Sequence, residues 1–343
     1  MKSVPVFAGL DYHQDSVQVC VMDASGVVLK NDSYRNDAEV IGKVVEKYGV
    51  EVRAGIESCT GAASLADVLA TRPGWTIDLA HPGFVSRMKQ NPDKTDFGDA
   101  QMLADLERVG YLPKVWLAPQ EVRELRRLVR YRQQLVDERR RVKLRISALL
   151  RDQRVRCPFR SSSLGWVKWL KTTKEVSEET RWILKRHARR VDGLDGDIAE
   201  VEARLIRLTK KDTLVNALQK QKGIGQVTAW TMRAEVGRFD RFRTGKQLAR
   251  FCGLTPRNAS SGQRQADAGL ISAGNRQLRS TLIEAAHRLI RHEDSWKRFA
   301  NKLMDRGKPK CVAVAAAANR WMRRLFHHMQ PAALTAKASV LAA

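Results

Sequence analysis

Short apolar runs alternate with polar positions over roughly the first 118 residues of the chain. A compact run ends at Asp11, Val17, Val19 and Val21 alternate with polar or small residues, and a further run begins at Val27. Alternation over a few residues, bounded by turn residues, is typical of half-buried strands. The pattern therefore predicts three consecutive strands.

Helix and strand signals alternate after these strands. Apolar residues at helical spacing predict a helix from Ala38 to Tyr48. The segments that follow are a strand at Val52–Glu57, a helix at Ala62–Ala70, a strand at Trp75–Ala80 and two helical pieces around Val85 and Met102. The order βββαβαβα predicts an α/β domain over residues 1–118, with a mixed sheet and helices outside it.

The pattern changes at about residue 119, where apolar residues begin to recur at intervals of three, four or seven. The first series is Leu128, Leu135, Val142 and Leu149, and the second is Leu184, His187, Val191, Leu194, Ile198, Val201, Leu205 and Leu208. Sustained spacing of this kind predicts two coiled-coil helices over residues 119–212. A connecting loop with a short amphipathic turn is expected between them, and Gly193 and Gly196 weaken the second helix locally.

Helical spacing dominates the rest of the chain, which predicts a mainly α-helical domain over residues 213–330 and a loose tail over residues 331–343. Lys222, Gly223 and Gly225 belong to a Lys-Gly-Ile-Gly segment between two predicted helices. A helix-hairpin-helix presents backbone N–H groups to a phosphate in this way, although the same segment also suits a plain tight turn.

Charge makes a nucleic-acid partner the leading expectation. The chain has 62 Lys and Arg against 37 Asp and Glu, a formal net charge of +25. Binding a chain this basic releases counterions from phosphates, which drives association. The first coiled-coil helix is very basic. Its excess of positive over negative side chains favours contact with phosphates, because a coiled-coil face that is only exposed to solvent usually has balanced charges. Arg126 and Arg130 are candidate contacts on it.

Membrane and disulfide chemistry are not expected. No stretch approaches the roughly 18–20 consecutive apolar residues that span a bilayer. The five cysteines are scattered without a CxxC pair, a pattern that argues against structural zinc or a disulfide framework. These features predict a protein of the bacterial cytosol and nucleoid that does not bind membranes.

Four carboxylates stand at positions where phosphodiester chemistry would need them. Asp11 and Glu57 close apolar strands, and Asp96 and Asp99 share one face at the start of a predicted helix. A single acidic residue at a strand end is usually solvated or caps a helix. Four converging carboxylates would repel one another unless a divalent cation cancelled their charge, and Mg²⁺ or Mn²⁺ prefers oxygen ligands. If the first and fourth strands are neighbours, the four predict a metal site able to hold the two ions of an in-line displacement.

A serine-containing loop follows Gly253. It contains Arg257, Ser260, Ser261 and Arg264. A serine hydroxyl that attacks a phosphodiester conserves the bond energy in a phosphoserine ester, and the two arginines could stabilise charge on the phosphorane. On spacing alone, Ser-Ser-Gly is also an ordinary turn.

Several motifs taken together resemble one family. They are GLDYHQDSVQVCVMD, GIESCTG, KTDFGDAQMLADL, KGIGQVTA, FCGLTPRNASSG and ISAGNRQLR. In this order they resemble the insertion-sequence one-hundred-ten family of transposases, also called bridge-RNA-guided recombinases. The resemblance covers most of the chain. The coiled-coil stretch and the tail carry none of these motifs and resemble the family only in their general sequence pattern.

The resemblance implies a fold, a site and partners. It implies a RuvC-like (RNase H-like) N-terminal domain with the DEDD residues at Asp11, Glu57, Asp96 and Asp99, and a C-terminal transposase domain with its nucleophile at Ser261. It also implies donor and target DNA, a structured non-coding guide RNA, and a tetramer built as a dimer of dimers in which the DEDD site of one subunit meets the serine of another. Base pairing with the RNA would then supply sequence specificity, which suits a chain with no clear reader helix.

Two other functions are compatible with parts of this pattern. The first is a RuvC-like nuclease or junction resolvase that activates only water and uses Ser261 as a turn residue. The second is a non-catalytic nucleic-acid scaffold, which gives no reason for charged residues at two strand ends.

Overall fold

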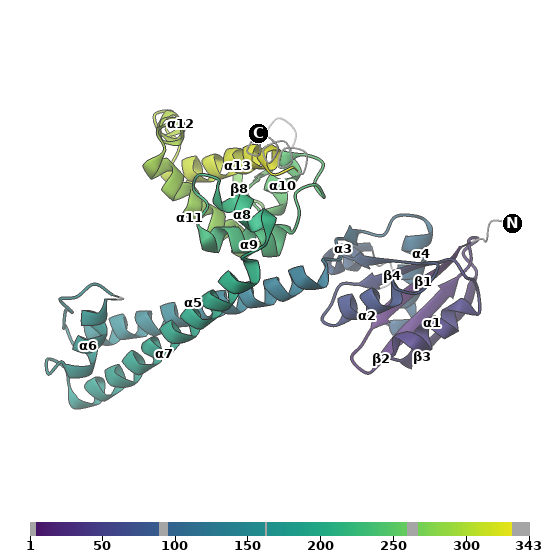
Figure 1. The fold of residues 1–343 in the computed structure, drawn as a ribbon, viewed down its shortest axis with the longest axis horizontal. Helices are drawn as coiled ribbons and strands as arrows, with labels where there is room; N and C mark the ends of the chain where they lie inside the picture. The colour runs from purple at the N-terminus through teal and green to yellow at the C-terminus, as the bar shows by residue number, and fades with distance from the viewer. Residues whose placement is uncertain (1–4, 89–94, 162, 259–266, 331–343) are drawn as a thin grey trace. The chain divides into compact units, whose positions relative to one another are not determined.

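The computed structural model describes residues 5–88, 95–161, 163–258 and 267–330 (Figure 1). The chain divides into two compact units, Met1–Ala118 and Pro119–Ala343. The first is a mixed α/β unit and the second is mostly helical, as the sequence predicts.

A six-stranded mixed sheet forms the centre of the first unit, in the order β3-β2-β1-β4-β5-β6. β1 pairs antiparallel with β2 and parallel with β4, and β4 pairs parallel with β5. The two-residue strand β6 was not predicted. The elements are β1 (Val6–Tyr12), β2 (Ser16–Met22), β3 (Val28–Arg35), α1 (Ala38–Glu46), β4 (Val52–Glu57), α2 (Ala62–Leu69), β5 (Trp75–Ala80), α3 (Pro82–Met88), α4 (Asp96–Arg108) and β6 (Lys114–Val115).

Alternation along β1 divides its side chains between two faces of the sheet. Ala8 and Leu10 belong to the core that contains buried residues of α1 and α2. Phe7 belongs to a separate core with Ala100 and Ala104 of α4. Because successive strand residues point to opposite faces, every second residue from Phe7 onward points towards the α4 side.

Two glycines let α4 lie directly on the sheet. A Cβ atom at Gly9 of β1 would lie 1.8 Å from the carbonyl oxygen of Ala100 and 2.6 Å from the amide nitrogen of Ala104. A Cβ atom at Gly55 of β4 would lie 3.1 Å from the carbonyl oxygen of Leu103. Glycine is the residue that permits such an approach of one backbone to another. The contact fixes the position of α4 on β1 and β4.

Replacing Gly9 with alanine is expected to lower the free energy of unfolding of the first unit by about 3 kcal/mol, the upper end of overpacking costs, because the added methyl group meets backbone atoms. Urea denaturation followed by circular dichroism measures the change. The matched control is Gly196→Ala in α7, where a Cβ meets nothing within 4 Å. That variant should gain up to about 1 kcal/mol of helix stability. An unchanged stability for Gly9→Ala would contradict the close packing of α4.

The second unit contains two long helices that pack against each other, followed by a helical bundle (Figure 1). The region between the long helices, expected as a connecting loop with a short amphipathic turn, contains the nine-residue helix α6. α7 is assigned as one uninterrupted helix through Gly193 and Gly196. The elements are α5 (Gln120–Asp152), α6 (Leu164–Thr172), α7 (Glu178–Thr209), α8 (Thr213–Gln219), α9 (Gln226–Val236), α10 (Gly245–Phe251), β7 (Pro256–Asn258), β8 (Asp267–Leu270), α11 (Arg276–His292), α12 (Asp294–Met304) and α13 (Lys310–His328).

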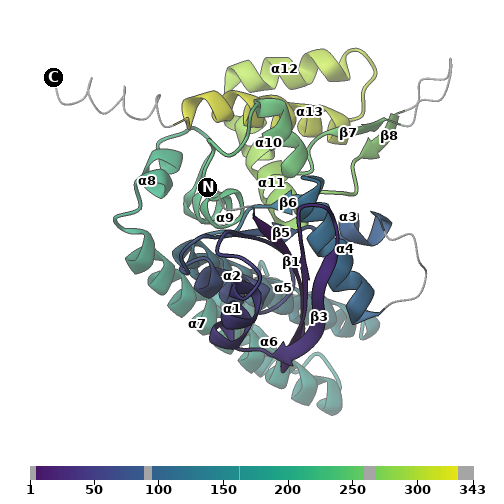
Figure 2. The same ribbon diagram turned by 90° about the vertical axis from the view of Figure 1, so that its right-hand side faces the viewer.

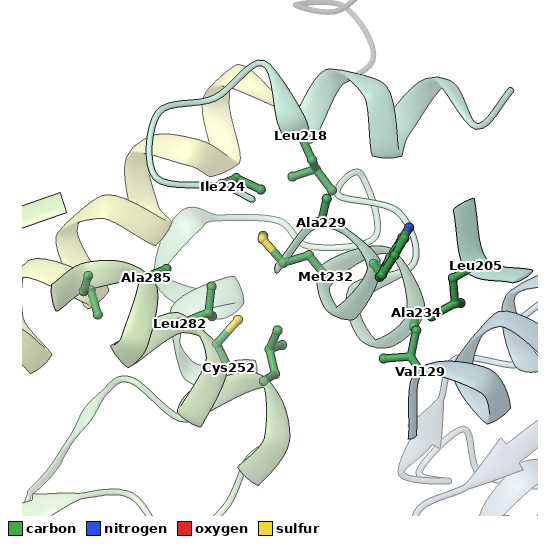
Figure 3. Close-up of a cluster of buried hydrophobic side chains, with 14 of the residues drawn as sticks. Val129, Leu205, Leu218, Ile224, Ala229, Met232, Ala234, Cys252, Leu282 and Ala285 are labelled. Atoms are coloured by element: carbon green, nitrogen blue, oxygen red, sulfur yellow. The ribbon is translucent and has the colours of Figure 1, made fainter. Parts of the chain in front are cut away.

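The core of this unit lies around α9, eight of whose residues are buried. Figure 3 shows Met232 of α9 among side chains of several other helices, including Cys252, which follows α10, and Leu282 of α11. The indole Nε1 of Trp230 donates a hydrogen bond of 2.9 Å to the hydroxyl of Thr209, at the end of α7. α7 is thereby joined to the bundle.

A short antiparallel pair, β7 and β8, lies between α10 and α11. The sequence predicts only a loop here, because strands of three and four residues carry too few positions to show alternation. The chain that connects β7 to β8 is residues 259–266, which lie outside the described residues.

Candidate active site

The ends of β1 and β4 bring two predicted site residues together. The strands are parallel neighbours with Leu10 opposite Ile56, so Asp11 and Glu57 follow side by side. Both continue the alternation through Gly9 and Gly55, which places them on the sheet face that α4 covers. The predicted condition for convergence, that the first and fourth strands are neighbours, is met.

The N-terminus of α4 carries the other two carboxylates. Thr95 caps the helix, since its hydroxyl accepts a hydrogen bond of 3.2 Å from the amide of Gly98. Asp96 and Asp99 lie in the first turn, where the helix dipole stabilises negative charge. The same helix meets Gly9 one turn further on, at Ala100, so the glycine contact sets the height of Asp96 above the end of β1.

His13 connects the two elements. Its Nε2 atom lies 3.5 Å from the carboxylate of Asp11 and 3.2 Å from the carboxylate of Asp96. One ligand atom from each of the three residues lies within 4.8 Å of the others. The side chain of Asp11 is 16% exposed and that of Asp96 is 55% exposed, so the group is anchored in the sheet and open on one side.

His13 was not predicted as a site residue. The signal was present, because residues i and i+2 of an extended segment share one face, and His13 stands two positions after Asp11. An imidazole beside two carboxylates can itself bind a metal ion or, when protonated, can offset their negative charge. The structure therefore adds a nitrogen donor to a site predicted from oxygen donors alone.

Glu57 and Asp99 lie outside the group of ligand atoms within 4.8 Å of one another among the described residues. Glu57 and Asp11 nonetheless both act on one neighbouring group, the thiol of Cys59. Burial is the main cause of a raised pKa at the Cys59 thiol, and the negative charges of Glu57 and Asp11 raise that pKa further. The structure thus places Asp11 and Glu57 at one sheet edge and joins Asp96 to Asp11 through His13. Asp99 lies three residues further along α4 and is half-buried.

The predicted serine site is described only in part. Ser261, with the neighbouring Ser260 and Arg264, lies outside the described residues. Arg257 lies in β7 and is exposed. The roles predicted for these residues stay predictions.

The predicted glycine turn between α8 and α9 is present in the structure. Gly223 has a φ of +83°, which favours glycine, and a Cβ there would lie 2.6 Å from the side chain of Leu289 in α11. Gly225 caps α9 without a side-chain hydrogen bond. Lys222 forms an ion pair of 3.1 Å with Glu293. This geometry is compatible both with a helix-hairpin-helix that contacts phosphate and with a plain tight turn. Phosphate contact by this segment remains a prediction.

Arg126 and Arg130 have an internal role that was not predicted. Arg130 donates from Nε and Nη2 to the carboxylate of Glu235, at 2.8 and 3.0 Å, and Arg126 donates to the carbonyl of Ala234 at 2.9 Å. Glu235 is 4% exposed and also accepts a hydrogen bond of 2.6 Å from Asn275, the cap of α11. These contacts tie α5 to α9 and α11. Nucleic-acid contact by the two arginines stays a prediction.

Among the helices that the structure describes, none combines the length and the apolar composition needed to cross a bilayer.

Comparisons with known proteins match both units. Residues 8–153 match a transposase family of the IS110 type named for its DEDD residues, and residues 215–301 match the family described as Transposase IS116/IS110/IS902. The first match contains Asp11, Glu57, Asp96 and Asp99. The second contains Ser261 and the glycine turn.

Individual relatives agree with the family matches. The chain is 26% identical over 333 residues to the transposase for insertion sequence element IS1111A of Coxiella burnetii, which covers 92% of this chain and 87% of the relative. It is 29% identical over 194 residues to y4qE of Sinorhizobium fredii, named as a transposase, and there the match spans only about half of the relative, 47%, and 56% of this chain. The transposase for IS1328 of Yersinia enterocolitica is 24% identical over 222 residues, 64% of this chain and 65% of the relative. With a DEDD-type match on the first unit and a Transposase IS116/IS110/IS902 match on the second, the chain belongs to the IS116/IS110/IS902 family of transposases, enzymes of DNA recombination.

Proposed function

We propose that the protein cuts and rejoins donor and target DNA through a phosphoserine intermediate at a metal-dependent site. One observation carries the proposal: Asp11 from the central strand and Asp96 from the start of α4 meet at His13 on the sheet face that also receives Glu57. Such a concentration of carboxylates is favourable when a cation offsets it. The residues proposed for the site are Asp11, Glu57, Asp96, Asp99 and Ser261.

The residues present fit a divalent cation. Asp11 and Asp96 offer oxygen atoms, and His13 offers a nitrogen atom, all within 4.8 Å of one another. Mg²⁺ binds through a few carboxylates and leaves positions for phosphate, and Mn²⁺ also accepts imidazole. When bound, the ion supplies polarisation of the phosphodiester and stabilises charge that develops in the transition state. Asp11 and Glu57 hold their places through the sheet, and Asp96 through the packing of α4 on Gly9.

Ser261 would supply the nucleophile. Its hydroxyl oxygen forms a bond to phosphorus and gives up its proton to solvent, while the bond between phosphorus and the leaving strand oxygen breaks. The leaving oxygen takes up a proton from solvent and becomes a strand hydroxyl. The reverse attack by a strand hydroxyl on the phosphoserine rejoins DNA without an external energy source. Arg257 and Arg264 would stabilise the negative charge of the pentacoordinate phosphorus.

The remaining partners are proposed on charge and family membership. The net charge of +25 supports binding to both DNA and a structured non-coding guide RNA, which would supply sequence specificity by base pairing. The packed helices α5 and α7 support a coiled coil, and the mixed sheet with strand-end carboxylates supports a RuvC-like domain. A tetramer would let the serine of one subunit join the acidic site of another. The cytosol and nucleoid are the proposed location.

Removing divalent metal is expected to stop strand cleavage. With the RNA and DNA substrates present, EDTA should abolish cleavage, and added Mg²⁺ or Mn²⁺ should restore it. DNA binding measured by fluorescence anisotropy serves as the control, since it depends on basic residues and should persist in EDTA. Cleavage at an undiminished rate in excess chelator would contradict a metal-dependent site.

A further inference from the structure

A groove of about 970 Å³ lies in the second unit between α13 and the β7–β8 pair. Its size is at the upper end of the range for ligand sites. Leu254 and Leu270 form part of one wall, Phe299 of α12 contributes from another side, and α13 supplies the rest. Figure 2 shows β7 and β8 together with α12 and α13. The amide of Asn319 donates a 3.1 Å hydrogen bond to the carbonyl of Leu254, which joins two walls of the groove.

The face of α13 that lines the groove changes character along the helix. Its first half presents Cys311, Val312 and two alanines, and its second half presents basic side chains. The face extends for roughly 24 Å from Cys311 to His327 at 1.5 Å per residue, which is long enough for several nucleotides. The basic residues are Arg320, Arg323, Arg324 and His327.

Two of these arginines are held by aromatic rings of α12. The guanidinium of Arg320 lies 4.9 Å from the ring centre of Phe299, and that of Arg324 lies 5.2 Å from the ring centre of Trp296. Stacking of this kind orients a guanidinium while its N–H groups stay available to phosphate oxygens. Among the side chains that the structure describes, no carboxylate forms an ion pair with Arg320, Arg323 or Arg324. The groove therefore has positive charge arranged for an anionic partner.

We propose that this groove binds unpaired nucleotides of the DNA strand that Ser261 attacks. Base faces would pack on the apolar half of the groove, and the arginines would bind the phosphates. A duplex hides its base faces within the stack, so the apolar half favours a single strand. Pro256 of β7 and Gly269 and Leu270 of β8 line the groove, and the chain between these two strands contains Ser261. The identity of the strand rests on the proposed function.

Cys311 provides a direct test, because it is exposed and lines the groove. The full-length protein is treated with N-ethylmaleimide, and mass spectrometry gives the alkylation rate at each cysteine. A 20-nucleotide single-stranded DNA should slow alkylation of Cys311 at least five-fold. Duplex DNA of the same sequence should slow it less than two-fold. This comparison needs no substitution and so does not depend on a variant folding.

Substitutions then test the arginines. Arg320→Ala combined with Arg324→Ala should abolish the protection of Cys311 by single-stranded DNA. Arg298→Ala, an exposed arginine of α12 that does not line the groove, should retain it. If both phosphate contacts are lost, the slope of log affinity against log salt should fall by about 1.4.

The other outcomes overturn the proposal. Equal protection by duplex DNA would mean that base faces are not bound. Stronger protection by an RNA of the same sequence would identify RNA as the occupant, and protection that grows with protein concentration alone would identify a second copy of the chain.

The Ser261→Ala protein should still show protection by single-stranded DNA. If that protein also cleaves DNA normally, the proposed nucleophile fails while the groove assignment stands.

Discussion

Replacing Asp11 with asparagine is expected to slow DNA strand cleavage on the order of a thousand-fold and to leave the fold intact. Asparagine has nearly the same shape but lacks the negative charge, so the site loses a metal ligand and several kcal/mol of transition-state stabilisation. Asp11 ends a buried strand and contacts His13 at 3.5 Å, which makes it the best-anchored carboxylate of the group. Single-turnover cleavage in Mg²⁺ measures the rate.

The matched control for this substitution is Asp15→Asn. Asp15 is exposed, stands four residues from Asp11 and lies outside the His13 group among the described residues. The variant removes the same charge from the same region, and its cleavage rate should stay within about two-fold of the unmodified protein, as expected for a screened surface charge. A wild-type rate for Asp11→Asn, with circular dichroism showing a native fold, would exclude the metal-dependent mechanism proposed for this site. Equal losses in both variants would point to a general effect of charge instead.

The placement of Asp11 and Glu57 could be predicted because it depends on local pattern. Each ends a run of alternating or apolar residues, and convergence was predicted on the condition that their strands are neighbours, which the structure meets. The position of α4 could not be predicted in the same way. It depends on the space above Gly9, and a glycine within a strand is equally typical of a bulge or a bend. The contact of Asp96 with His13 follows from that tertiary packing.

The roles of Arg126 and Arg130 show a second limit of sequence reasoning. Both stand on a strongly basic helix, so charge alone favoured phosphate contact. Their partner Glu235 lies about a hundred residues away in α9 and is buried. A buried carboxylate needs such partners, because an unpaired charge in the interior is costly. Pairs between residues so distant in the chain leave no periodic signal.

The long helices were predicted well, but not each position on them. The spacing placed His187 and Leu208 on the buried side of the second helix. Ala188 is buried instead, and Leu208 is 52% exposed. The helix ends at Thr209, whose hydroxyl accepts the hydrogen bond from Trp230. The bundle thus buries Thr209 at the end of the helix and leaves Leu208 on the open side, which the three–four spacing could not reveal.

Ser261→Ala is expected to abolish strand cleavage together with any covalent protein–DNA adduct. Alanine removes the oxygen that would bond to phosphorus and changes nothing in the carboxylate group, so Mn²⁺ binding followed by electron paramagnetic resonance should be unaffected. An SDS-resistant adduct, mapped by peptide mass spectrometry, should form on the unmodified protein and be missing from the variant. Ser260→Ala is the matched control, since it removes the neighbouring hydroxyl and should retain the adduct and most of the cleavage.

Each of the other results would assign the chemistry differently. An adduct lost in Ser260→Ala and kept in Ser261→Ala would move the nucleophile by one residue and preserve the phosphoserine mechanism. Full cleavage by both variants, with loss in Asp11→Asn, would leave a site that activates water alone, which is the behaviour of a RuvC-like nuclease or resolvase. The two classes differ in energetics as well. A phosphoserine retains the energy of the broken bond for rejoining, whereas hydrolysis releases it, so hydrolysed strand ends cannot be rejoined without an external energy source.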